Sequence, residues 1–196
     1  DPELDIEEII KTIKGPDFPT GAIIVGKTAI KEAYRTGQGK VRVRSKASIE
    51  EGSKGQMSII VTEVPYGINK ASMIARIADL VRDKKLDGIR DIRDESSKGE
   101  VRIVIDLKKD VNPRVMLNRL YKHTELESNF SIIMIALVDG RPRLLNIKEI
   151  LVEYIKHQKE VLTRRTRFDL AKAEARAHIL EGYIIALDNI EEIIRT

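Results

Sequence analysis

The chain has 196 residues, of which 42% are hydrophobic and 34% charged, and its 35 basic and 31 acidic side chains leave a net charge of +4. This apolar content excludes a disordered chain, and the absence of cysteine excludes disulfides and thiolate metal sites. No apolar run approaches the roughly 20 residues that span a bilayer. Because the first residues, Asp1-Pro2-Glu3-Leu4, contain neither a methionine nor a signal-peptide pattern, we expect a piece of a longer protein.

The first third of the chain alternates helix and strand patterns. Isoleucines at helical spacing predict a short helix that begins after Asp5 and ends at Gly15-Pro16, and a second helix is predicted over 28–35. Residues 40–46 alternate polar and apolar, and 57–64 are rich in β-branched side chains. We therefore predict a hairpin of these two strands, with residues 50–55 as its mobile tip.

The middle of the chain continues this mixture. Asn69 is expected to cap a helix, strands are predicted at 89–93 and 101–107, and Pro113 opens another helix through Leu120. The apolar run 132–138 predicts a well-buried strand.

The last part of the chain has a helical pattern throughout. From Ile147 onward there is no proline and no glycine before Gly182, which predicts one continuous helix of about 50 residues, or about 75 Å. Such a helix is expected to pack against a returning helix or a second chain. The fold class expected for the whole chain is α+β, with a mixed sheet and flanking helices, followed by a long C-terminal helix of the coiled-coil type.

A row of basic residues is the strongest candidate for a binding surface. Strand alternation places Lys40, Arg42, Arg44 and Lys46 on one face, about 6.6 Å apart. Four like charges repel one another unless an anion covers them, so we predict contacts with the backbone of DNA. The alternative is an edge strand that carries lysine and arginine to prevent aggregation, although one or two charges would suffice for that.

Asn69 and Lys70 form a second candidate DNA-binding site, because an ammonium beside the free N–H groups of a helix N-terminus suits a phosphate. A solvated lysine is the alternative. The charges around Arg164 and Arg165 are interpreted as solvated helix surface. The three histidines have no second ligand at metal spacing, so neither a metal site nor a catalytic acid–base pair is predicted.

Several segments, in order over nearly the whole chain, resemble the A subunits of DNA gyrase and topoisomerase IV, the bacterial type IIA topoisomerases. They are Gly15-Pro16-Asp17-Phe18-Pro19-Thr20, Ala33-Tyr34-Arg35-Thr36-Gly37-Gln38-Gly39-Lys40, Glu63-Val64-Pro65-Tyr66-Gly67-Ile68-Asn69-Lys70, Asp87-Gly88-Ile89, Arg93-Asp94-Glu95 and Arg176-Ala177-His178-Ile179-Leu180-Glu181-Gly182. Arg164-Arg165-Thr166 and Ala175-Arg176-Ala177-His178 resemble gyrase more closely.

The resemblance implies three parts for this chain. Residues 1–20 would connect to a preceding winged-helix domain that the chain lacks, residues 21–146 would form the α+β tower domain, and residues 147–196 would enter the coiled coil. The family's DNA-cleaving tyrosine follows an arginine, and none of the five tyrosines here does, so the chain alone is expected to be inactive.

For the parent enzyme, the resemblance implies ATP-dependent passage of duplex DNA through a transient double-strand break, with the tower supporting the bent gate segment. Its partners would be double-stranded DNA, the B subunit, which brings ATP and Mg²⁺, and a second A subunit in an A2B2 complex of the bacterial cytoplasm. This fragment would need no cofactor of its own and no membrane. Two alternatives remain open: a fragment of the topoisomerase IV A subunit, and a non-enzymatic helical adaptor with a basic α+β head, which would not bind duplex DNA in a salt-sensitive way.

Overall fold

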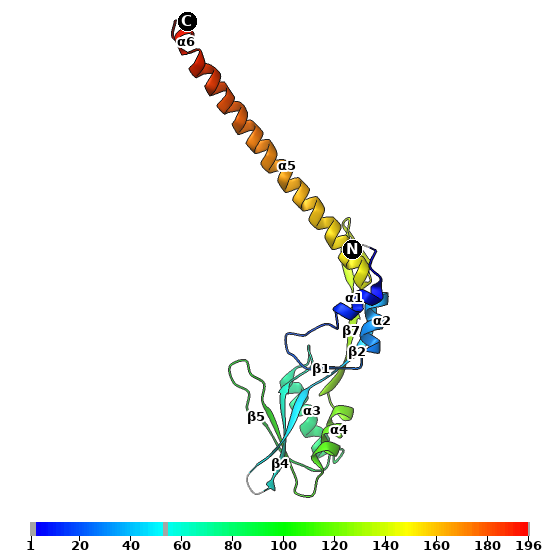
Figure 1. The fold of residues 1–196 in the computed structure, drawn as a ribbon. Coiled ribbons are helices and arrows are strands. Elements are labelled where there is room, and N and C mark those ends of the chain that lie inside the picture. The colour runs from blue at the N-terminus through cyan, green and yellow to red at the C-terminus, as the bar shows by residue number, and fades with distance from the viewer. Residues whose placement is uncertain (1–2, 53–54, 196) are drawn as a thin grey trace. The chain divides into compact units, whose positions relative to one another are not determined.

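The computed structural model describes residues 3–52 and 55–195 (Figure 1). These residues form two compact units, the first spanning Glu3–Ile147 and the second Lys148–Thr196, of which Thr196 itself is not described. Each unit is considered separately.

The first unit begins with a three-stranded sheet and two short helices. Strand β2 (Gln38–Arg44) lies between β1 (Ile23–Val25) and β7 (Glu127–Ile133), and both pairings are antiparallel. Helices α1 (Ile6–Thr12) and α2 (Thr28–Thr36) supply apolar side chains to the core beside this sheet. The buried members of that core are Ile10, Ile30, Tyr34, Val41 and Val43.

A second, four-stranded sheet completes the same unit. Its strands are β3 (Lys46–Glu51), β4 (Met57–Glu63), β6 (Ile103–Leu107) and β5 (Ile89–Asp94), in that order and all antiparallel. Helices α3 (Lys70–Arg82) and α4 (Pro113–His123) share a core with this sheet (Figure 1). Its fully buried side chains include Ile59, Met73, Ile77, Ile103, Ile105, Met116, Leu120 and Leu126.

The predicted α+β class and the positions of the four shorter helices, α1 to α4, are confirmed, but the mixed sheet is wrong. Every strand pairing in the described residues is antiparallel, and the strands form three separate sheets. Periodicity identifies a strand without specifying the direction of its neighbour, so this error follows from the limits of the pattern.

The predicted hairpin was assigned to the wrong first strand. The chain changes sheets at Ser45, whose N–H donates to the carbonyl of Leu126 at 2.7 Å, so residues 40–44 and Lys46 lie in different sheets. In the hairpin β4 pairs with β3, and on its other side it pairs with β6. Strand β3 includes Glu50 and Glu51, two charged residues that the sequence pattern placed in the loop. An edge strand tolerates such charges because one of its sides faces solvent. Residues 53–54 of the predicted mobile tip lie outside the described residues.

The apolar run 132–138 is not one buried strand. It includes the end of β7 and all of β8 (Ile135–Val138), which pairs with β9 (Arg141–Leu144) in a third sheet. Ile133, Ile135 and Leu137 are 62%, 61% and 74% exposed, whereas Ile132 and Met134 pack in the core of the first sheet. A continuous apolar run has no period, so the sequence did not show which side of the strand is covered.

The long helix is shorter than predicted. Helix α5 (Ile147–Asp188) has 42 residues and is followed, after Asn189, by α6 (Ile190–Arg195). The amide side chain of Asn189 donates to the carbonyl of Ile185 at 2.8 Å, which is how asparagine competes with helical hydrogen bonding. No residue of α5 is buried. None of the described helices is both long and apolar enough to cross a membrane.

Candidate nucleic-acid interface

The candidate interface is the solvent-facing side of the β1-β2-β7 sheet. The predicted alternation along β2 is confirmed, since Val41 and Val43 are buried in the core while Lys40 and Arg42 are exposed. The register pairs Lys40 with Ser131 and Arg42 with Asn129 on β7, and both partners are exposed. Directly paired residues project from the same face of an antiparallel sheet. Two cations therefore lie beside two hydrogen-bonding side chains on one open face.

Asn129 and Ser131 were not identified from the sequence. Their signal was the alternation with Phe130 and Ile132, which pack in the core of this sheet. The apolar run that predicted a strand begins only at Ile132, so both polar residues fell outside it.

Arg44 belongs to the same strand but is held by the protein itself. Its Nε and Nη2 lie 2.6 and 2.5 Å from Oε2 of Glu127, a carboxylate that is 14% exposed. Its guanidinium also lies over the ring of Tyr121, 4.4 Å from the centroid, where a cation interacts favourably with the aromatic face. Arg42 is only 3.6 Å from the other oxygen of Glu127, a longer and weaker pair. Within the basic row, Arg44 is therefore already neutralised by a carboxylate of the same chain.

Lys46 is separated from the row. It lies on β3 of the other sheet, and its Nζ is 2.9 Å from Oε1 of Glu63. The second oxygen of Glu63 accepts the N–H of Ala22 at 2.5 Å. The hydrogen bond from Lys46 and then that from Ala22 lower the pKa of Glu63. The four predicted cations thus do not share one surface, and Lys40 alone among them has no carboxylate within ion-pair distance in the described chain.

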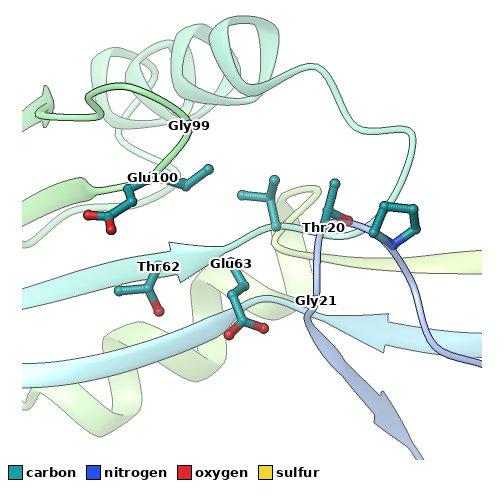
Figure 2. A pocket seen from close by; sticks show the side chains of 9 residues that line it. Thr20, Gly21, Thr62, Glu63, Gly99 and Glu100 are labelled. Atoms are coloured by element: carbon teal, nitrogen blue, oxygen red, sulfur yellow. The ribbon is translucent and has the colours of Figure 1, made fainter.

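A cavity of about 590 Å³ lies beside Glu63 but does not suit a phosphate. Figure 2 shows its lining side chains, with the Glu63 carboxylate extending from β4 towards Gly21. The ionisable groups of its lining are two carboxylates, Glu63 and Glu100. An anionic ligand would be repelled there, so we do not place the interface in this cavity.

Asn69 and Lys70 lie at the N-terminus of α3. This helix shares its core with the four-stranded sheet and not with the β1-β2-β7 sheet. Asn69 caps the helix as predicted, because its side-chain oxygen accepts the N–H of Ser72 at 3.0 Å. Lys70 does not project freely, since its Nζ is 2.8 Å from Oδ2 of Asp94. The hydrogen bond from Lys70, with further ones from Ser96, lowers the pKa of Asp94 to about 2. A phosphate at this position would compete with Asp94.

The Lys70–Asp94 pair makes stability depend on pH. The folded-state pKa of Asp94 lies below its ordinary value of 3.8, so the pair's contribution is present above about pH 4 and is lost as the pH falls towards about 2. We expect Asp94→Asn to lower the free energy of unfolding at pH 5 and to have less effect at pH 2.5, measured by urea denaturation. Asp110→Asn, an exposed loop change, is the control. An equal effect of Asp94→Asn at both pH values would contradict this account.

The open side of the four-stranded sheet is also charged, but it is neutralised by its own carboxylates. Arg93 contacts Asp106 at 2.5 Å, Asp91 at 2.8 Å and Glu95 at 3.3 Å. Arg102 contacts Glu95 at 3.2 Å. Cations that are paired in this way have little charge left for a nucleic acid, so the β1-β2-β7 face remains the better candidate.

Comparison with known proteins agrees with the resemblance seen in the sequence. A family model that describes the A subunit of DNA gyrase/topoisomerase IV matches residues 2–196. The DNA gyrase A subunit of Clostridium acetobutylicum is 57% identical over 193 residues, which is 98% of this chain and 23% of that protein. The DNA gyrase A subunit of Staphylococcus aureus is 56% identical over 196 residues, or 100% of this chain and 22% of the relative. The chain therefore spans less than a quarter of the length of these relatives.

Proposed function

This chain belongs to the family of DNA gyrase and topoisomerase IV A subunits, and we propose that within such a protein it supports bent duplex DNA. The open face of the β1-β2-β7 sheet carries the proposal, because Lys40 and Arg42 project there beside Asn129 and Ser131. Side chains of these types contact phosphate oxygens and position a protein on a duplex without reading its sequence.

The energetic role of such a face is to offset bending. Smooth bending of a 20–30 base-pair site costs on the order of 1–6 kcal/mol, and cationic contacts along the duplex arms compensate for it. We assign the tower domain to residues 21–146, with residues 1–20 leading into it. The names of the similar proteins favour gyrase over topoisomerase IV for the parent enzyme. Membership of the family also disfavours the helical adaptor.

The DNA-cleaving nucleophile is proposed to lie outside this chain. Burial raises the pKa of both Tyr34 and Tyr121, which disfavours the phenolate that would attack a phosphate. The hydroxyl of Tyr121 also donates to the carbonyl of Ser45 at 3.2 Å. These two side chains are therefore structural.

ATP, Mg²⁺ and the partner subunits are proposed to act elsewhere in the parent complex. Among the residues that the structure describes, there is no group of three or more histidine, cysteine, aspartate or glutamate side chains that could hold a metal ion. We propose that ATP and Mg²⁺ enter with the B subunit, and that a second A subunit completes an A2B2 complex in the bacterial cytoplasm. The α5 helix would pair with another helix as a coiled coil.

Salt-dependent binding tests the proposed function. We expect the 196-residue chain to bind duplexes of unrelated sequence with similar affinity, and the logarithm of that affinity to fall with the logarithm of salt by about 0.9 for each phosphate contact. Fluorescence anisotropy over a salt series measures this slope. Affinity that does not change with salt, or no binding at low salt, would rule out the DNA-supporting role.

A further inference from the structure

The α5 helix has one line of side chains that changes character along its length. Residues spaced three and four apart stay on one face of a helix with 3.6 residues per turn. Near the beginning this line contains Leu151, Tyr154 and Val161, with Gln158 between them, and towards the end it contains Ile179, Tyr183 and Leu187. Five of these apolar side chains are between 42% and 66% exposed.

The central part of the same line is charged. Between Val161 and Ile179 its four positions are Arg165, Asp169, Lys172 and Arg176, a net charge of +2. Asp169 already lies 3.9 Å from Arg165 on the same helix. Lys172 and Arg176 have no carboxylate within ion-pair distance among the described residues. Exposed helix surface can carry any charge, but here apolar residues continue along the same line on both sides.

A helix that covers both apolar parts of this line must also cross its charged centre. Covering unpaired cations with an apolar or basic surface would remove their hydration without compensation. A second copy of α5 would bring the same net charge of +2 against this one, in either orientation. A polar residue in a helix–helix seam fixes register and partner choice at some loss of stability.

We propose that Lys172 and Arg176 select a partner helix that carries carboxylates at the centre of its apolar seam. The charged centre would thereby set the register of the pair, since a shifted partner would place apolar residues on the cations. This inference rests on the proposed coiled-coil pairing of α5 and adds the chemistry of its partner.

Two synthetic helical peptides test the proposal with the 196-residue chain. Both have leucine along one seam, and they differ only at four central seam positions, which are all glutamate in one and all lysine in the other. We expect the glutamate peptide to bind about tenfold more tightly at low salt, because each of several ion pairs contributes a fraction of that factor. High salt should reduce the preference.

Matched variants locate the selecting charges. Lys172→Glu with Arg176→Glu should reverse the preference, whereas Lys159→Glu with Arg167→Glu makes the same charge change off the line and should leave it intact. Circular dichroism checks that both variants keep the helix content of the parent chain.

Three outcomes would overturn the proposal. Equal binding of both peptides would leave the coiled-coil pairing in place and remove the charge selection. Binding of neither peptide would remove the pairing itself. Loss of duplex DNA binding in the Lys172→Glu, Arg176→Glu variant, with no change in peptide preference, would identify these cations as nucleic-acid contacts.

Discussion

Replacing Lys40 and Arg42 by alanine should flatten the salt dependence of duplex binding by about two units, since each phosphate contact accounts for about 0.9. At about 0.1 M salt the same loss corresponds to a decrease in affinity on the order of 50-fold. The reason is that these two cations project from the open face of β2, with Lys40 unpaired in the described chain and Arg42 only loosely paired with Glu127. Anisotropy titrations at several salt concentrations measure both quantities.

Two control variants make this test specific. Arg114→Ala with Arg119→Ala removes the same net charge from exposed positions on α4 and should change the slope little. Arg44→Ala with Lys46→Ala should also leave most of the slope, because both side chains are already paired with carboxylates. If the Arg44 and Lys46 variant loses more of the slope than the Lys40 and Arg42 variant, the internal ion pairs do not decide which cations bind DNA.

Replacing Gly37 by alanine should lower the free energy of unfolding by about 3 kcal/mol. Gly37 ends α2 with a φ of +80°, a left-handed conformation that costs an L-residue roughly 1–2 kcal/mol. A Cβ added there would lie 2.5 Å from the carbonyl oxygen of Leu145, and backbone cannot move aside as a flexible side chain can. The carbonyl of Gly37 also accepts the N–H of Met134 at 2.7 Å, so the strain would reach the chain between β7 and β8.

Gly26 provides the matched control for this substitution. Its φ is +90°, but an added Cβ would meet nothing within 4 Å. Gly26→Ala should therefore cost only the conformational term of roughly 1–2 kcal/mol. Urea denaturation followed by circular dichroism measures both variants, and equal losses would show that the contact with Leu145 has no energetic consequence.

Local features of this chain were predictable because their causes lie within a few residues. Asn69 caps α3 because its side chain accepts a backbone N–H in the first turn of the same helix. Pro113 suits the beginning of α4 because the N–H that proline lacks has no helical partner at that position. The end of α2 at Gly37 depends on the backbone freedom of one residue. The alternation of Lys40, Val41 and Arg42 likewise reflects the geometry of a single strand.

The tertiary structure, by contrast, decided which lysine and arginine side chains are free of carboxylate partners and can contact DNA. Glu127, which holds Arg44, is 83 residues away in the sequence, and Asp94, which holds Lys70, is 24 residues away. The switch of sheets at Ser45 separates Lys46 from the basic row, and the register of β2 with β7 brings Asn129 and Ser131 beside Arg42 and Lys40. Strand order and register depend on the packing of whole apolar faces, which one segment's periodicity does not contain. Charge was therefore visible in the sequence, whereas its neutralisation depended on contacts that only the folded chain makes.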